Sequence, residues 1–280
     1  MGTKRKEARM KFGLIGRTLG HSCSPEIHQK LFQALYQEGN SYELLEMEPE
    51  ELESRLKQLA AEGYTGVNVT IPYKRAVMPF LKGVSAEAEA IGAVNTIKFT
   101  EDGMFGFNTD YTGFGRSLLG MGADPHGKVC VVLGTGGAAR AVVQFLADHA
   151  PKELLAVSRH KNEQDEFREF LEKNGGSLIS YEELDGRSGD ILVNCTPVGM
   201  FPKTGKAAVS EEVVKNFHAA MDLIYNPKET EFLRMGRVNG LKTRNGMYML
   251  TAQAVAAEEI WQNLQVPEEI LQKIAEDMEA

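Results

Sequence analysis

The feature that most constrains the fold of this chain is the glycine-rich turn Gly134–Ala139, which follows the strand-like run Lys128–Leu133. That run is continuously apolar after its first residue, as expected for a strand buried on both faces of a parallel sheet. A helical pattern over Ala138–His149 comes next. In this context the turn fits the G-x-G-x-x-[GA] fingerprint, whose glycines let a pyrophosphate approach the helix N-terminus. The sequence therefore predicts a dinucleotide-binding unit, with a turn that serves packing alone as the alternative.

The residues after this turn repeat the strand–helix pattern. Further strand-like runs occupy Glu153–Ser158, Ile191–Asn194 and Ala220–Ile224. Repeated βα units predict a Rossmann-type, doubly wound parallel sheet, which we place over residues 112–246. A chain of 280 residues is long enough for two domains, so the remaining residues are expected to form a second one.

The residues on either side of this sheet are also predicted to be α/β. Ser24-Pro25 fits an N-cap followed by a proline at the first position of a helix. The other expected elements are strands at Lys11–Ile15 and Gly66–Ile71, a helix at Glu50–Ala61, a hairpin of Ala93–Phe99 and Met104–Asn108 around Asp102-Gly103, and helices over Met247–Leu264 and Pro267–Met278. We expect the last two helices to return to the first domain, which gives a domain of residues 1–111 plus 247–280.

Composition argues against several classes of protein. The net charge is −8, and the one basic cluster, within Met1–Lys11, is interpreted as a solvated tail, so no nucleic-acid partner is expected. The sequence contains no run of about 18 apolar residues, so no membrane span is predicted. The three cysteines, Cys23, Cys130 and Cys195, are too few and too widely spaced for a disulfide framework, which favours a reducing, cytoplasmic setting.

The end of the second predicted strand of the parallel sheet indicates which dinucleotide would bind. NAD sites usually carry a carboxylate at this position, which binds the ribose hydroxyls. This chain has Ser158-Arg159-His160-Lys161 instead, with no carboxylate. Arg159 could bind a 2′-phosphate through two hydrogen bonds. The sequence therefore favours NADP(H), with a solvated basic turn as the alternative.

Polar residues gather at the ends of the strands and helices expected in the first domain. Ser22 and Ser24 place two hydroxyls at a helix N-terminus, where they could donate to a carboxylate or simply cap the helix. A zinc site built from His21, Cys23 and His28 lacks a completing cluster, so no metal is predicted. The other polar positions are Asn68 and Thr70 on one strand face, Lys74 just beyond that strand, Asn95-Thr96, and Asn108-Thr109-Asp110. Taken singly, Lys74 could be a surface lysine and Asp110 a helix N-cap.

Taken together and in order, these segments resemble the shikimate dehydrogenase family over nearly the whole chain. The matching motifs are the HSxSPxxH segment at His21–His28, GxNVTxPxK at Gly66–Lys74, GAxNT at Gly92–Thr96, NTDxxG at Asn108–Gly113, GxGGAA at Gly134–Ala139, NCTPVGM at Asn194–Met200, DLIYNP at Asp222–Pro227 and GMYMLTAQA at Gly246–Ala254. The resemblance implies an oxidoreductase that interconverts 3-dehydroshikimate and shikimate with NADP(H), within the chorismate pathway to the aromatic amino acids. Hydride would pass between the nicotinamide and the carbon that becomes the carbonyl.

The resemblance also assigns roles to residues. It makes Lys74 and Asp110 the catalytic pair, with Lys74 as the acid–base group and Asp110 as its orienting partner. It makes the substrate site Ser22, Ser24, Asn68, Thr70, Lys74, Asn95, Asp110, Tyr225 and Gln253. It makes the cofactor site Gly134, Thr135, Gly136, Gly137, Ala138, Ser158, Arg159, His160, Lys161 and Thr196, with Met221 and Gly246 near the nicotinamide.

The sequence departs from the family pattern at three places. Thr18 stands where the family often has proline, Gln29 where it often has asparagine, and Ser158-Arg159-His160 where it has Asn-Arg-Thr. Two alternatives remain: a quinate/shikimate dehydrogenase of the same fold, which could also use NAD, and a non-catalytic NADP-binding sensor. The lack of an acidic residue beside Arg159 argues against the use of NAD. The presence of both Lys74 and Asp110 argues against a sensor. Both a monomer and a homodimer remain open.

Overall fold

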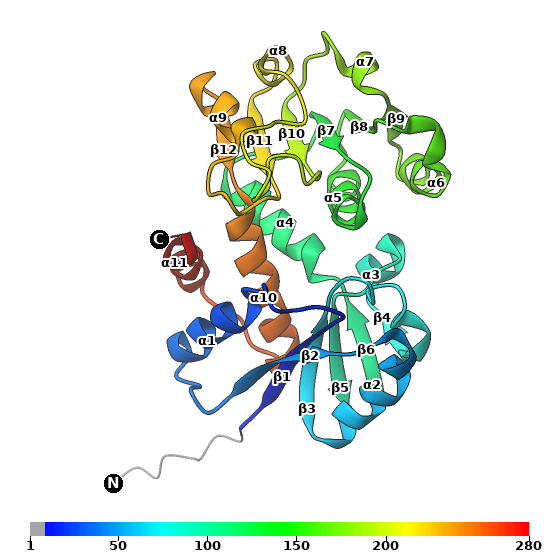
Figure 1. The fold of residues 1–280 in the computed structure, drawn as a ribbon, viewed down its shortest axis with the longest axis vertical. Coiled ribbons are helices and arrows are strands. Elements are labelled where there is room, and N and C mark those ends of the chain that lie inside the picture. The colour runs from blue at the N-terminus through cyan, green and yellow to red at the C-terminus, as the bar shows by residue number, and fades with distance from the viewer. Residues whose placement is uncertain (1–8, 280) are drawn as a thin grey trace. The chain divides into compact units, whose positions relative to one another are not determined.

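The computed structural model of the protein describes residues 9–279 (Figure 1). The chain divides into two compact units. The first runs from the start of the described chain to Thr109 and resumes over 253–278, and the second comprises Asp110–Ala252. The boundaries between the units therefore fall within two helices, α4 (Thr109–Gly120) and α10 (Gly246–Gln262). The sequence predicts these boundaries after residues 111 and 246.

The second unit contains a six-stranded sheet in which every strand pair is parallel. Its strands are β7 (Val129–Leu133), β8 (Glu153–Val157), β9 (Ser177–Ile179), β10 (Ile191–Asn194), β11 (Ala219–Asp222) and β12 (Lys242–Arg244). Their order in space is β12-β11-β10-β7-β8-β9, which reverses direction between β7 and β10. This is the order of a doubly wound dinucleotide-binding fold, so the predicted fold class is confirmed.

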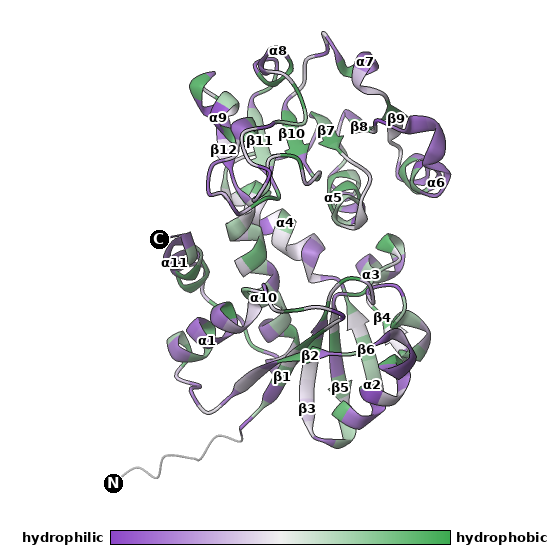
Figure 2. Ribbon diagram, in the orientation of Figure 1, coloured by the Kyte–Doolittle hydropathy of each residue, from purple (hydrophilic) through white to green (hydrophobic). Residues whose placement is uncertain are grey.

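Helices cover both faces of this sheet, which explains why its central strands are continuously apolar. Cys130 and Val132 of β7 pack in a core with α4, α5 (Gly137–Asp148) and α6 (Asp165–Lys173). The intervening Val131 and Leu133 pack in a separate core with α7 (Tyr181–Leu184), α8 (Glu211–Val214) and α9 (Glu231–Val238). Figure 2 shows β7 and β10 in the hydrophobic colour.

The first unit contains a mixed six-stranded sheet in the order β2-β1-β3-β5-β6-β4. Its strands are β1 (Lys11–Gly16), β2 (Ser41–Glu46), β3 (Tyr64–Val69), β4 (Gly83–Val84), β5 (Thr96–Thr100) and β6 (Gly103–Phe107). Its helices are α1 (Ser24–Ala34), α2 (Leu52–Ala61), α3 (Ala86–Ile91) and α11 (Glu268–Glu279), together with most of α10. Short 3-10 helices occupy Pro49–Glu51 and Met78–Phe80 here, and Lys161–Glu163 in the second unit. The predicted hairpin is confirmed as antiparallel β5 and β6, with Thr100 opposite Gly103.

The faces of the mixed sheet are also covered by helices. Leu52, Leu56 and Leu59 of α2 pack in one core with β3 and β5. In another core, Trp261 of α10 stacks on Phe12 of β1, and its indole Nε1 donates to the Ile97 carbonyl of β5 at 2.9 Å. A Cβ at Gly66 would lie 2.1 Å from this indole nitrogen, so the close approach of the ring requires a glycine in β3.

The structure corrects two expectations near the N-terminus. Helix α1 begins at Ser24 with Cys23 as its N-cap, and the Ser22 hydroxyl accepts from the Ser24 N–H at 3.2 Å, so Ser24 is not the cap. The expected tail does not extend to Lys11, because Lys11 begins β1 and its ammonium donates to the Glu62 carbonyl at 3.2 Å. Lys4, Arg5 and Lys6 of that tail lie outside the described residues. Over residues 9–279, none of the helices is both long and apolar enough to span a membrane.

Candidate active site

The glycine turn of the second unit presents an open backbone surface suited to an anion. Gly134 has a φ of +97°, and a Cβ there would lie 2.8 Å from Cγ2 of Thr196, so the turn requires glycine at this position. Gly136 is the N-cap of α5 and makes no side-chain capping bond. Gly136, Gly137 and Ala138 are exposed, and a Cβ at either glycine would meet no atom within 4 Å. The positive end of the α5 dipole and its N–H groups are therefore accessible, as a bound pyrophosphate requires.

The basic residues after β8 line a hollow of about 430 Å³. Arg159 and His160 are exposed, whereas the Lys161 ammonium donates to both Glu183 carboxylate oxygens at 2.8 and 2.7 Å. Within residues 9–279, no carboxylate forms an ion pair with Arg159. The Ser158 hydroxyl accepts from the His160 N–H at 3.2 Å and so shapes the turn. Glu163 and Glu183 also line the hollow, and Glu183 engages Lys161, so Arg159 is the basic side chain that remains available to an anion there.

A buried hydrogen-bond network supports Thr196, which follows β10. The Asn194 side-chain oxygen accepts from the Thr196 N–H at 3.0 Å and from its hydroxyl at 2.7 Å. The Asn194 amide donates to Asp222 at 3.0 Å, and Asp222 also accepts from the Thr230 hydroxyl at 2.6 Å and the Ile224 N–H at 3.1 Å. Asn194 and Asp222 are fully buried. The network thus fixes the chain after β10 relative to the chain after β11.

Asp222 predicts a pH dependence of stability. Burial raises its pKa to about 6, although bonds from Thr230, Ile224 and Asn194 favour the carboxylate. Because the folded pKa lies above the unfolded one, the stabilising contribution is fully present below about pH 4 and is lost as the pH rises through about 6. A difference of about two pKa units corresponds to about 3 kcal/mol. Urea unfolding at a series of pH values should show the stability of the wild type falling by about this amount relative to Asp222→Asn. A difference between the two proteins that stays constant with pH would contradict this assignment.

Two further predicted cofactor residues have packing roles in the second unit. A Cβ at Gly246 would lie 2.0 Å from the Leu223 carbonyl oxygen, and the Gly246 N–H donates to the Ile224 carbonyl at 3.0 Å. Gly246 therefore holds the segment that leads to Tyr225. Met221 is completely buried in the core of this unit. The Thr135 hydroxyl donates to the Gln164 side chain at 3.0 Å.

In the first unit, amide and hydroxyl side chains form a buried network at the ends of β3 and β5. The Asn68 amide nitrogen donates to the Thr96 hydroxyl at 3.0 Å, and that hydroxyl donates to the Asn95 side-chain oxygen at 3.1 Å. The same Asn95 oxygen accepts from the Thr109 N–H at 2.7 Å. Each of these residues is at most 5% exposed. The predicted substrate residues Asn68 and Asn95 therefore belong to one rigid polar cluster.

This cluster also fixes the backbone near the two predicted catalytic residues. Lys74 follows β3, and its carbonyl accepts from the N–H of Val94, the residue before Asn95, at 2.8 Å. The buried Tyr73 beside it donates its hydroxyl to the Met47 carbonyl. Asp110 follows Thr109 in the chain and lies in the first turn of α4. Residues 94 and 95, which precede β5, thus anchor both the Lys74 turn and the start of α4.

The remaining predicted substrate residues are divided between the units. Ser22, Ser24, Thr70 and Gln253 belong to the first unit and are half-buried, whereas Asp110 and Tyr225 are half-buried residues of the second. His28 does not contribute to a metal cluster, because its imidazole Nδ1 lies 2.6 Å from a carboxylate oxygen of the buried Glu258. Among residues 9–279, no three His, Cys, Asp or Glu side chains are grouped so that they could hold a metal ion.

Sequence reasoning missed the residues that hold the site residues in place. Tyr42 donates its hydroxyl to Asn68, Thr96 and Thr109 complete the cluster around Asn95, and Asn194 and Asp222 support Thr196. Asn194 ends the predicted strand Ile191–Asn194, and Asp222 lies in the middle of the predicted strand Ala220–Ile224. Each is the first residue of a motif shared with the family, which was the available signal. Tyr42 lies on β2, a half-exposed edge strand whose sequence has no clear alternation, so no local pattern indicated it.

Comparison with known proteins gives consistent matches along the chain. Residues 14–97 match the family model described as the shikimate dehydrogenase substrate binding domain. The NADP(+) shikimate dehydrogenase of Clostridium beijerinckii is 44% identical over 265 residues, which cover 93% of this chain and 95% of that protein.

Solved structures match nearly the whole length of the chain. A chorismate mutase/shikimate 5-dehydrogenase fusion protein from Clostridium acetobutylicum has a TM-score of 0.91 at 44% identity, covering 97% of this chain and 98% of the other. Shikimate 5-dehydrogenase from Thermus thermophilus, solved in complex with NADP(H) and shikimate, has a TM-score of 0.84 at 33% identity, covering 96% and 99%.

Proposed function

This chain belongs to the shikimate dehydrogenase family, and from that premise we propose that it catalyses the reversible NADP-linked reduction of 3-dehydroshikimate to shikimate. The observation that carries the proposal is the buried cluster of Asn68, Thr96 and Asn95. It provides fixed hydrogen-bonding groups for a polyhydroxylated ring, and it anchors the backbone at Lys74 and at the start of the helix that carries Asp110. Such preorganisation is what a site needs to orient a ring for reaction.

The acid–base chemistry is assigned to Lys74 and Asp110. Bound NADPH supplies the hydride. Reduction of the substrate carbonyl then requires a proton at its oxygen, and oxidation of shikimate requires the removal of that proton. Lys74 donates and accepts this proton, and the Asp110 carboxylate orients the ammonium or the substrate hydroxyl. Both residues follow backbone segments fixed by hydrogen bonds to residues 94 and 95, so little reorganisation is needed.

Substrate recognition is assigned to hydroxyls and amides. Ser22 and Ser24 at the start of α1 donate to the ring carboxylate, with support from the helix N-terminus. Asn68, Thr70, Asn95, Tyr225 and Gln253 bind the ring hydroxyls and the carboxylate. Hydroxyl and amide groups can both donate and accept, which suits a substrate that carries several hydroxyls.

Cofactor binding is assigned to the second unit. The exposed backbone of Gly134–Ala138 receives the pyrophosphate, and Thr135 and Thr196 contribute hydroxyls nearby. Arg159, His160 and Lys161 border the hollow that takes the 2′-phosphate, and Ser158 shapes the turn that carries them. Within this group, Arg159 makes the main contact, because Glu183 already neutralises Lys161. Gly246 and Met221 are assigned to the nicotinamide side. A cytoplasmic location is proposed because Cys23, Cys130 and Cys195 are all unpaired.

A spectrophotometric assay tests the proposed function. The purified protein should reduce NADP when shikimate is added, as followed by the absorbance of NADPH. Parallel assays with quinate and with NAD distinguish a dehydrogenase of broader specificity. Binding of NADP without turnover of either acid would indicate a sensor and would refute the proposed activity.

A further inference from the structure

Tyr42 contacts a proposed substrate-binding residue, although it belongs to neither the substrate site nor the catalytic pair. Its hydroxyl donates to the Asn68 side-chain oxygen at 2.8 Å. A side chain of β2 thereby holds the amide of a residue near the end of β3.

The Tyr42 ring is held on one face by a buried acid–base pair. The His28 imidazole stacks on it with the ring centroids 3.9 Å apart and the planes inclined by 13°. His28 Nδ1 lies 2.6 Å from Glu258 Oε1, both side chains are fully buried, and Gln262 donates to the other Glu258 oxygen at 2.6 Å. The ring is therefore clamped between β2 and side chains of α1 and α10. Burial, with a contribution from the Glu258 carboxylate, holds the pKa of Tyr42 well above its ordinary value, so it stays a hydroxyl donor.

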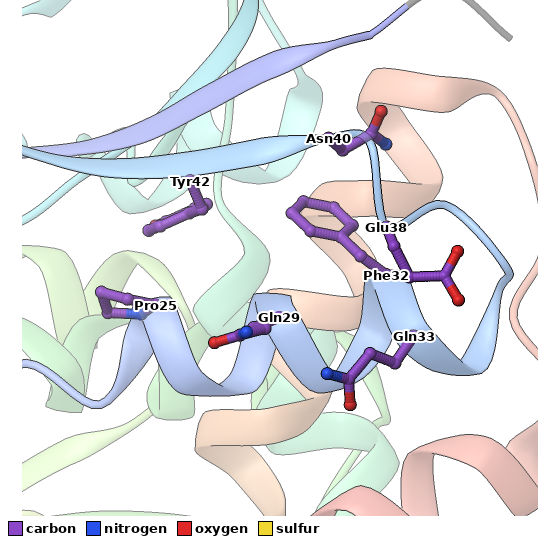
Figure 3. A pocket seen from close by; sticks show the side chains of 7 residues that line it. All are labelled: Pro25, Gln29, Phe32, Gln33, Glu38, Asn40 and Tyr42. Atoms are coloured by element: carbon purple, nitrogen blue, oxygen red, sulfur yellow. The ribbon is translucent and has the colours of Figure 1, made fainter. Parts of the chain in front are cut away.

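Close packing does not surround the ring on every side. A hollow of about 210 Å³ borders Tyr42 and is lined by Pro25, Gln29, Phe32, Gln33, Glu38 and Asn40 (Figure 3). In Figure 3 the Tyr42 ring extends from β2 toward the start of α1, near Pro25. The orientation of the phenol thus depends on the His28 stack and on its hydrogen bond to Asn68.

We propose that Tyr42 is a positioning residue for substrate binding, whose hydroxyl sets the orientation of the Asn68 amide before the ring acid binds. The bond from Tyr42 fixes the Asn68 oxygen on one side, so the Asn68 nitrogen must face Thr96. Because the Asn68 amide is oriented before the substrate arrives, less free energy is lost in ordering it on binding. This inference rests on the proposed function, because it concerns the same substrate.

Steady-state kinetics of Tyr42→Phe test the inference. The change keeps the ring and its stack on His28 but removes the hydrogen bond to Asn68. We expect the KM for shikimate to rise about 3- to 10-fold, the effect of losing one hydrogen bond that orients a binding group. The kcat should change by less than about 3-fold and the KM for NADP by less than about 2-fold, because Tyr42 touches neither the reacting atoms nor the cofactor unit.

Tyr64→Phe is the matched control. It removes a tyrosine hydroxyl from the same unit, one that donates to Glu43 at 2.9 Å, and it should leave the KM for shikimate unchanged. An unchanged KM in Tyr42→Phe would overturn the inference. A Tyr42→Phe protein that fails to fold, or that loses affinity for shikimate and NADP alike, would also overturn it by assigning Tyr42 to general stability. Failure of the wild type to oxidise shikimate would instead refute the proposed function, and this inference with it.

Discussion

Replacing Lys74 with alanine is expected to lower the kcat for shikimate oxidation by about 10²- to 10⁴-fold, the usual contribution of a positioned acid–base group. The KM for NADP should change by less than about 2-fold, because the cofactor turn belongs to the other unit. The change removes the ammonium but retains the backbone, so the bond from the Val94 N–H to the carbonyl of residue 74 can persist. Stopped-flow measurement of NADPH formation separates a slower chemical step from slower product release.

Lys57→Ala provides the control for this experiment. Lys57 is an exposed lysine of the same unit, on α2, and it pairs with Glu53 at 2.7 Å. Exposed pairs of this kind contribute little to stability, so the variant should retain wild-type kinetics. A Lys74→Ala enzyme with near-normal kcat would refute the acid–base role of Lys74.

Replacing Arg159 with alanine is expected to weaken NADP binding by about 10- to 100-fold, the range expected for a charge-assisted hydrogen bond. NAD binding should change by less than about 3-fold, because NAD has no 2′-phosphate to pair with the guanidinium. The change therefore removes most of the preference between the two cofactors. Isothermal titration of both cofactors against the wild type and the variant measures this difference.

Arg187→Ala is the control for a general loss of positive charge from the second unit. Arg187 is a partly exposed arginine that pairs with Glu153 at 3.4 Å. Its removal should leave the ratio of NADP to NAD affinity unchanged. Equal losses of NADP and NAD affinity in Arg159→Ala would show that Arg159 does not select the cofactor.

The parts of the fold that could be predicted from the sequence are those specified by local patterns. The continuously apolar β7, the glycine turn after it and the start of α5 each carry a signal within about ten residues. The β5–β6 hairpin has a short turn that ends at Gly103, whose φ of +132° favours glycine. These signals are strong because burial on both faces and a positive φ each restrict the residue types allowed.

The contacts that hold the site together could not be predicted in the same way. The bond between Tyr42 and Asn68 joins residues 26 positions apart, and the pair of His28 and Glu258 joins residues 230 positions apart. Such pairings depend on which strands become neighbours, and no local pattern encodes that order. The same limit explains why the pairing of Lys161 with Glu183 was not predicted, because Glu183 lies further along the chain, on α7. The N-cap of α1 is Cys23 instead of the predicted Ser24, a shift of one residue that depends on loop geometry.

The most direct test of the account is the fate of the hydride. The protein should be incubated with 3-dehydroshikimate and NADPH dideuterated at C4 of the nicotinamide, and the product analysed by mass spectrometry. We predict shikimate that carries one deuterium, bound to the carbon that was the carbonyl. No shikimate, or shikimate without deuterium, would contradict the assignment of this chain as an NADP-linked shikimate dehydrogenase.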